Sequence, residues 1–191
     1  MNRQDAHKDS DTARKPCPEG RLSSPTKDRG GRPVVDVTTY IPYFLSSVNN
    51  SLSRGASQFY LEHFGIGIVE WRVVSMLAIE PRIPASRICE VVALDKGATS
   101  RALMRLHELG YLSFEAHEPD PRKKIWWLNE NGDRLHDRIL QVALERERQL
   151  IRDADPDDLE AFLRVMRIMR RNVDKISTAS LQDALDATDG D

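Results

Sequence analysis

The sequence lacks several features that define common classes of protein. It has two cysteines, Cys17 and Cys89, which lie far apart and form no Cys-x-x-Cys unit, so neither a zinc site nor a disulfide framework is indicated. No apolar run approaches the roughly 20 residues that a membrane helix needs. The first residues lack the apolar core of a secretory signal. We therefore expect a cytoplasmic protein without a membrane partner.

Features of catalytic and metal sites are also scarce. Gly65-Ile66-Gly67 is not followed by the third glycine of a nucleotide-binding loop, and no grouping of Ser, His and Asp stands out. The histidines do not have the spacing of metal ligands; they are His7, His63, His107, His117 and His136. We expect no enzyme, no cofactor and no metal.

The net charge of −2 gives no sign of a nucleic-acid ligand. Evidence for or against nucleic-acid binding must therefore come from the local distribution of charge. Residues 1–33 carry eight basic and five acidic side chains and few apolar ones. Because such a segment buries too little surface to offset its ordering entropy, we expect a disordered tail. Residues 177–191 carry four aspartates and no basic residue, and we expect an acidic tail that extends the last helix briefly and then frays.

The chain between these tails is predicted to be mostly helical. Apolar spacing, N-caps and breakers predict the following helices: about 38–62, 68–79, 84–92, 95–109, 129–152 and 155–176. Strands are predicted at 111–116 and 124–128, where the apolar period changes to two. A short helix, a turn, a helix and a β-hairpin follow one another in the order of a winged helix-turn-helix. The predicted fold class is mostly α, with a small β-hairpin wing and a helical dimerisation domain.

The helix predicted at 95–109 has the composition of a recognition helix. Its inner side carries alanines and leucines, and its other side carries small residues and cations with no carboxylate between Asp95 and Glu108. A helix in a major groove needs small side chains for close approach, and hydroxyl and guanidinium groups for base edges. Ordinary solvated helix faces mix both signs of charge. The candidate DNA contacts on this helix are Lys96, Gly97, Ser100, Arg101 and Arg105.

The predicted hairpin adds a basic tip with Arg122, Lys123 and Lys124 beside a proline loop. A basic turn alone is most often a solvated turn. Next to a recognition helix, however, it is placed to reach the flanking DNA backbone or minor groove.

These segments resemble the MarR family of bacterial regulators. The resemblance rests on residues 94–112, on Asp120-Pro121-Arg122, and on Leu128-Asn129-Glu130-Asn131-Gly132, and it covers about residues 38–176. Asn129 stands where the family usually has Thr, which keeps the N-cap chemistry. Phe114 stands where a basic residue is common on the first wing strand.

The resemblance implies a homodimer that binds a pseudo-palindromic double-stranded DNA operator, as a repressor. Residues 34–62 and 129–176 would form the dimerisation region, and residues 63–128 the DNA-binding module. Arg122 would enter the minor groove and Asp120 would brace the wing. Ser100 and Arg101 would face bases, while Lys96 and Arg105 would face phosphates. The apolar terminal helices independently favour burial against a partner.

The resemblance also implies release from DNA by a small effector of the aromatic-acid type. An anionic aromatic ligand needs a cation and a stacking surface. Candidates at the junction of the dimerisation and DNA-binding regions are Tyr40, Tyr43, Phe44, His63, Trp71 and Arg72. Core packing of Trp71 and ion pairing of Arg72 remain open as ordinary structural roles.

Two other hypotheses stay open at this stage. A redox-sensing regulator would need a reactive cysteine near the first helix, whereas Cys17 lies in the N-terminal tail and Cys89 in the predicted third helix. A winged-helix module used only for protein contacts would not need a cationic helix face. Salt-dependent binding of duplex DNA would distinguish such a module from a DNA-binding regulator.

Overall fold

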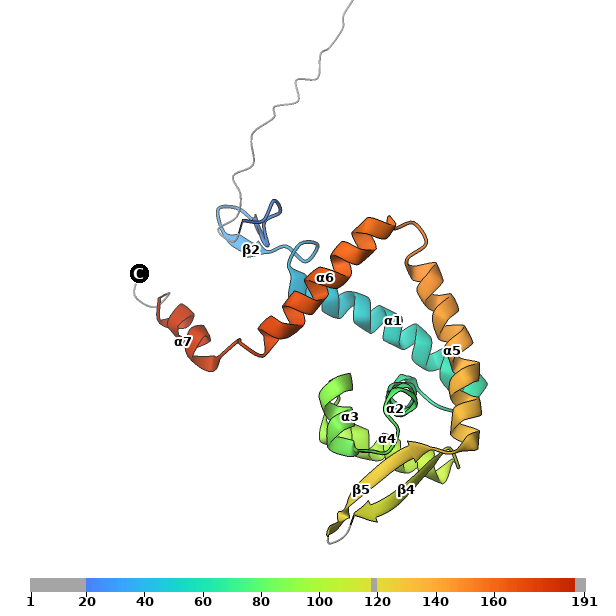
Figure 1. Cartoon of the computed structure of the whole chain (residues 1–191). Helices are drawn as coiled ribbons and strands as arrows, with labels where there is room; N and C mark the ends of the chain where they lie inside the picture. The colour runs from blue at the N-terminus through green and yellow to red at the C-terminus, as the bar shows by residue number, and fades with distance from the viewer. Residues whose placement is uncertain (1–19, 118–119, 188–191) are drawn as a thin grey trace, which may run out of the picture. The chain divides into compact units, whose positions relative to one another are not determined.

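The computed structural model describes residues 20–117 and 120–187, without the side chains of residues 117, 120–123 and 180. Most of it is helical, with two small antiparallel sheets (Figure 1). The elements are β1 (Thr26–Asp28), β2 (Pro33–Val35), α1 (Ile41–Phe64), α2 (Ile68–Ile79), β3 (Ile83–Pro84), α3 (Ala85–Val92), α4 (Lys96–Glu108), β4 (Leu112–His117), β5 (Asp120–Leu128), α5 (Glu130–Leu150), α6 (Pro156–Val173) and α7 (Thr178–Asp186). The chain divides into two compact units, residues 1–139 and 140–191, and the boundary falls inside α5.

The predicted helices are confirmed, and their ends follow local chemistry. The first helix, α1, has a proline in its first turn and ends at Gly65, whose φ of 71° is left-handed. The Asn129 side chain accepts a hydrogen bond from the Gly132 N–H at 3.1 Å, at the start of α5. Similarly, Asp155 Oδ1 accepts the Asp157 N–H at 2.8 Å before α6. Side-chain caps of this kind satisfy N–H groups that have no partner within the helix.

The predicted wing is present, but its sheet is larger than the sequence suggested. The second wing strand, β5, pairs antiparallel with β4 on one side and with the two-residue β3 on the other, where Ile83 faces Trp126. The second wing strand was predicted from residue 124, whereas β5 begins at Asp120. A two-residue strand has too few side chains to show a period of two, which is why β3 was missed.

The predicted disorder of residues 1–33 is wrong for residues 26–33. These residues belong to the hairpin β1–β2, in which Thr26 pairs with Val35 and Asp28 with Pro33. Gly30 and Gly31 form its turn with φ of 65° and 82°, values that glycine adopts without steric cost. The Arg21 guanidinium donates to the Thr39 carbonyl at 2.8 Å, which joins the segment before the hairpin to the segment that follows it. Residues 1–19 lie outside the described part of the chain.

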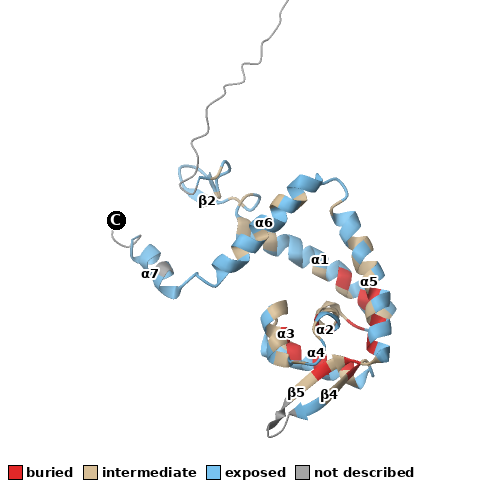
Figure 2. Cartoon of the chain, in the orientation of Figure 1, coloured by how far each residue is buried: buried red, intermediate tan, exposed pale blue. Residues whose placement is uncertain are grey.

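The core of the first unit lies between the winged module, the second half of α1 and the start of α5 (Figure 2). The buried side chains come from α1 (Ala56, Tyr60), the α1–α2 corner (Ile66), α2 (Val73, Val74, Met76, Leu77), α3 (Ile88), α4 (Thr99, Ala102, Leu103, Leu106), the wing (Leu112, Trp126, Leu128) and α5 (Leu135, Ile139). Helix α4 is therefore held from behind by α2, α3 and the first wing strand, β4.

An ion pair joins the end of α2 to α3. The Arg87 guanidinium donates to both carboxylate oxygens of Glu80, at 2.8 and 2.9 Å, and lies 3.1 Å from the Glu90 carboxylate. These hydrogen bonds hold the pKa of Glu80 below its ordinary value of about 4.5 and raise the pKa of Arg87. The pKa of Glu80 is therefore lower in the folded chain than in the unfolded chain. The ion pair stabilises the fold fully at a pH above the unfolded-state pKa, and this stabilisation is lost as the pH falls through the folded-state pKa.

Glu80→Gln should therefore lower the melting temperature at neutral pH, and the difference from wild type should shrink as the pH falls below about 4.5. Thermal melts across this range measure it. The control is Glu90→Gln, which removes the single, more exposed contact and should have a smaller effect. A difference between wild type and Glu80→Gln that stays constant with pH would contradict the assignment of the ion pair.

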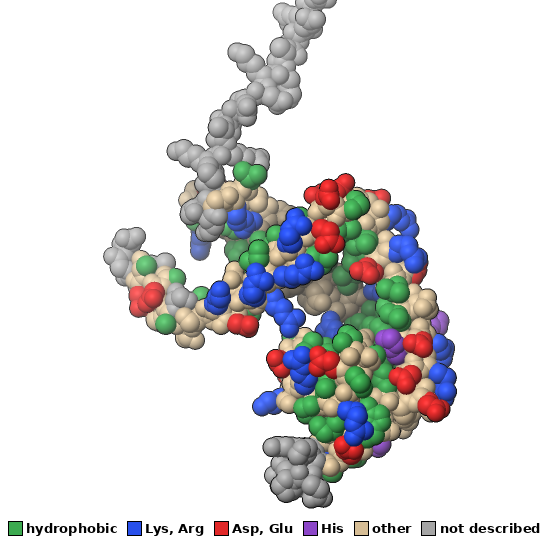
Figure 3. All heavy atoms as spheres, in the orientation of Figure 1, with side chains coloured by type: hydrophobic (Ala, Val, Ile, Leu, Met, Phe, Trp, Pro, Cys, Tyr) green, Lys and Arg blue, Asp and Glu red, His purple; other side chains and the backbone are tan. Residues whose placement is uncertain are grey.

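The second unit has almost no core of its own. Helix α6 has no buried residue, although Phe162, Leu163, Val165 and Ile168 are spaced along it. Lys and Arg side chains gather along the same helix (Figure 3). The acidic tail was expected to extend the last helix, but residues 178–186 instead form a separate helix, α7. None of the helices within the described ranges is both long and apolar enough to cross a membrane.

Candidate nucleic-acid interface

Helix α4 begins where the sequence predicted. Asp95 is its N-cap, and the Asp95 carboxylate accepts the Ala98 N–H at 2.8 Å. Gly110, with φ of 78°, ends the segment and turns the chain toward β4. Because the cap fixes the first residue, the two sides of the helix are set without ambiguity of register.

The exposed side of α4 is the one that the sequence assigned to DNA. Thr99, Ala102, Leu103 and Leu106 are buried against α2 and α3. The exposed residues up to Arg105 are Lys96, Gly97, Ser100, Arg101, Met104 and Arg105. Thr99 was not singled out in the sequence, and its burial is explained by the Cys89 thiol, which donates to its hydroxyl at 3.2 Å. That contact also gives Cys89 a structural role, while Cys17 lies outside the described residues.

A groove runs between the start of α3, the exposed side of α4 and the wing. It encloses about 960 Å³. Its lining consists of Pro84, Ala85, Ser86, Lys96, Ser100, Leu103, Met104, Lys124, Ile125 and Trp126. Hydroxyl groups and two ammonium groups thus line one open groove, which suits the sugar-phosphate backbone and base edges of a duplex.

Lys124 is the one predicted wing cation whose side chain is described. Its ammonium lies 3.9 Å from the centroid of the Phe114 ring and 5.5 Å from that of Trp126. The sequence treated Phe114 only as the loss of a basic residue. The side chains of Asp120, Arg122 and Lys123 are outside the described part of the wing, so their assignment to DNA stays a prediction.

Arg105 has a structural role that the sequence did not reveal. Its guanidinium donates to the Gly65 carbonyl at 3.2 Å and lies 3.8 Å from the Glu70 carboxylate. Glu70 also accepts the Gly67 N–H at 3.0 Å. This side of α4 and the α1–α2 corner enclose a hollow of about 470 Å³ that Arg101 also lines. Arg105 therefore fastens α4 to the corner, and only its remaining donors are available to a phosphate.

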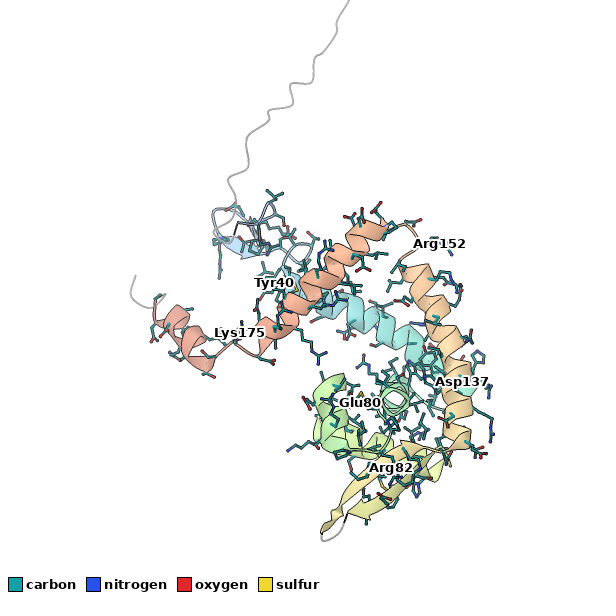
Figure 4. The ribbon with its side chains drawn as sticks, in the orientation of Figure 1. Tyr40, Glu80, Arg82, Asp137, Arg152 and Lys175 are labelled. Atoms are coloured by element: carbon teal, nitrogen blue, oxygen red, sulfur yellow. The ribbon has the colours of Figure 1, made fainter. Side chains whose placement is uncertain are left out.

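The residues suggested as one effector pocket do not come together within one chain. Tyr40, Tyr43 and Phe44 are exposed at the beginning of α1, and Figure 4 shows Tyr40 at the other end of that helix from Asp137 of α5. His63 is in the last turn of α1, roughly 30 Å away at 1.5 Å per residue. The six-residue pocket is therefore wrong for a single subunit.

His63, Trp71 and Arg72 lie around the second half of α1 instead. The Arg72 guanidinium donates to the Ser53 hydroxyl at 3.4 Å, and the His63 and Phe59 rings are 4.2 Å apart. Trp71 stacks on His136 of α5 with 5.6 Å between ring centroids and 27° between planes. His136 was missed because its contact with Trp71 spans 65 positions of sequence, which periodicity does not reveal.

The order α2, α3, α4, β4, β5, with an N-capped, cation-bearing α4 exposed beside the hairpin, defines a winged helix-turn-helix DNA-binding protein. Comparisons with known proteins agree. Residues 64–123 match the model of the MarR family. The chain is 26% identical over 108 residues to the HTH-type transcriptional regulator YwoH of Bacillus subtilis, covering 56% of this chain and 78% of YwoH.

Solved structures extend this likeness to the flanking helices. A MarR/EmrR family transcriptional regulator from Acinetobacter sp. ADP1 is similar with a TM-score of 0.69 and 27% identity, over 74% of this chain and all of that one. The PcaV regulator from Streptomyces coelicolor, solved with its natural ligand, has the same fold, with a TM-score of 0.62 and 18% identity over 73% and 98% of the two chains.

Residues 64–123 therefore form a winged helix-turn-helix that matches the MarR family, and the relatives that the chain resembles are transcriptional regulators. The members of this family regulate transcription and are not enzymes, in agreement with the sequence.

Proposed function

We propose that the chain is a homodimeric repressor that binds a pseudo-palindromic operator through α4 and the wing and is released by a small effector. The observation that carries this proposal is the exposed side of α4, which bears cations and small residues and adjoins the groove containing Lys124. The proposed DNA contacts are Lys96, Gly97, Ser100, Arg101, Arg105, Asp120, Arg122, Lys123 and Lys124.

Duplex binding measured against salt concentration tests this function. A regulator that neutralises several phosphates should lose affinity steeply as salt rises, with a slope of roughly −0.9 for each phosphate contacted. Binding to an inverted repeat should exceed binding to a scrambled duplex. A protein-interaction module would bind neither duplex, and that result would overturn the proposal.

Dimerisation is supported by apolar side chains that the single chain leaves exposed. Phe44, Val48 and Leu52 lie at four-residue spacing on α1 and are each at least 37% exposed. Helix α6 adds a second exposed apolar side in the other unit. Apolar surface repeated at helical spacing on two helices is typical of an interface between subunits.

Sedimentation of the purified protein at micromolar concentration should therefore give about twice 21.8 kDa. Phe44→Glu combined with Val48→Glu should yield monomers, because each carboxylate would be buried without a partner. Ile79→Glu is the control: Ile79 is 75% exposed at the end of α2, outside the proposed interface. A monomeric wild type would contradict the proposed architecture.

For the effector, we propose a small aromatic carboxylate held near Arg72. The cation of Arg72 and the stacked Trp71 and His136 rings supply the two kinds of contact that such a ligand needs. A structural relative, PcaV, was solved with a ligand of its own. Benzoate should raise the melting temperature of wild type but not of Arg72→Gln, and neutral benzamide should have no effect on either. Equal shifts with benzoate in both proteins would exclude Arg72.

A further inference from the structure

The middle of the wing holds a compact group of aromatic rings next to Lys124. Phe114 on β4 pairs with Trp126 on β5, and their ring centroids are 4.9 Å apart. His107 at the end of α4 meets the Phe114 ring edge-on at 5.0 Å, and its Nδ1 lies 2.9 Å from the Leu112 carbonyl. The Phe114 ring is therefore supported from α4 on one side and from β5 on the other.

This support gives the Lys124 ammonium a defined position. Lys124 pairs with Ala116 in the sheet, two residues along β4 from Phe114, so its side chain reaches diagonally over the Phe114 ring. The negative face of an aromatic ring attracts a cation within about 6 Å of its centroid. A lysine stem is otherwise flexible and loses rotamer entropy whenever it is ordered by a ligand. Because the Phe114 ring already restricts the Lys124 side chain, less rotamer entropy remains to be lost when a ligand binds.

The fixed ammonium faces the proposed DNA surface. Lys124 lines the same groove as Lys96 and Ser100 of α4, so a duplex that meets α4 would bring its backbone past this point. Phe114 stands where a basic residue is common in the MarR family. Its ring instead provides the surface that the Lys124 ammonium from β5 contacts.

We propose that Phe114 is a positioning residue for DNA binding, which holds the Lys124 ammonium on the wing for contact with a backbone phosphate. This inference rests on the proposed DNA-binding function. Phosphate contacts do not depend on base sequence, so a random-sequence duplex serves as the probe.

A double-mutant cycle in the full-length protein tests the role of Phe114. Lys124→Met removes the charge and keeps an unbranched apolar stem; it should reduce the salt slope by roughly one for each wing that contacts DNA. Phe114→Leu keeps an apolar side chain and removes the ring; it should weaken binding about two- to fivefold, the size of one exposed cation–π contact. In the Lys124→Met background, Phe114→Leu should have no further effect. Phe114→Tyr retains the ring face and should bind as wild type does.

Two results would overturn the proposal. If Phe114→Leu weakens binding equally with and without the lysine charge, Phe114 acts only by packing. If Phe114→Tyr is as weak as Phe114→Leu, the ring face is irrelevant.

Failure of the proposed function would look different, since wild type itself would then bind no duplex at any salt concentration. Should Phe114→Leu unfold, Phe114→Met, which also keeps an apolar side chain without a ring, takes its place in the same double-mutant cycle.

Discussion

Gly132→Ala should destabilise the protein by roughly 2–3 kcal/mol, the upper range for a side chain forced into filled space. A β-carbon on Gly132 would lie 2.3 Å from the Tyr111 carbonyl oxygen and 3.1 Å from a methyl group of Leu128. The carbonyl has little freedom to move away, because it accepts the Asn129 N–H at 3.1 Å. The start of α5 would have to shift relative to the wing.

Denaturant titration of the variant measures this loss, with Gly55→Ala as the matched control. Gly55 lies inside α1, and a β-carbon there meets nothing within 4 Å of it. Gly55→Ala should therefore leave stability unchanged or raise it by up to about 1 kcal/mol through helix propensity. Equal stabilities for the two variants would show that the close approach of α5 to Tyr111 is not needed.

Arg101→Ala should cost on the order of 1–3 kcal/mol of operator affinity for each half-site. Arg101 is exposed in the first half of α4, six residues after the Asp95 cap, where base edges are normally met. Losing a base contact should reduce the ratio of operator affinity to random-DNA affinity. Lys96→Ala is the control from the first position of α4. It should weaken both duplexes together and reduce the salt slope by about one for each module bound.

Salt titrations of both variants on operator and scrambled duplexes make this comparison. If Arg101→Ala lowers both affinities equally while Lys96→Ala affects only the operator, the roles of the two residues are exchanged. Melting temperatures close to that of wild type should accompany both substitutions, since neither side chain belongs to the buried side of α4.

The fold was predictable wherever a local signal determines it. Asp95 and Gly110 bound α4 as expected because caps and left-handed glycines act within a few residues. The hairpin β1–β2 has a local signal, the Gly30-Gly31 dipeptide, but the polar composition around it favours disorder. Residues 26–35 form a hairpin with little burial, which composition alone does not predict.

The site was predictable in its exposed surface and not in its long-range contacts. Periodicity along α4 gave the exposed cations, but the contact of Arg105 with Gly65 joins residues 40 positions apart. The Lys124–Phe114 contact depends on strand register, and a slip of one residue between β4 and β5 would abolish this contact. The six effector candidates do not lie together in one chain, since the length of α1 separates Tyr40 from His63.

The most direct measurement of the central claim is a hydroxyl-radical footprint of the wild-type protein on duplexes selected from a random library. A symmetric dimer reading DNA with α4 should select an inverted repeat and protect two patches related by a two-fold axis. Their centres should lie about 10 base pairs, roughly 34 Å, apart. Protection of one asymmetric patch, or selection of no sequence above random, would contradict the account.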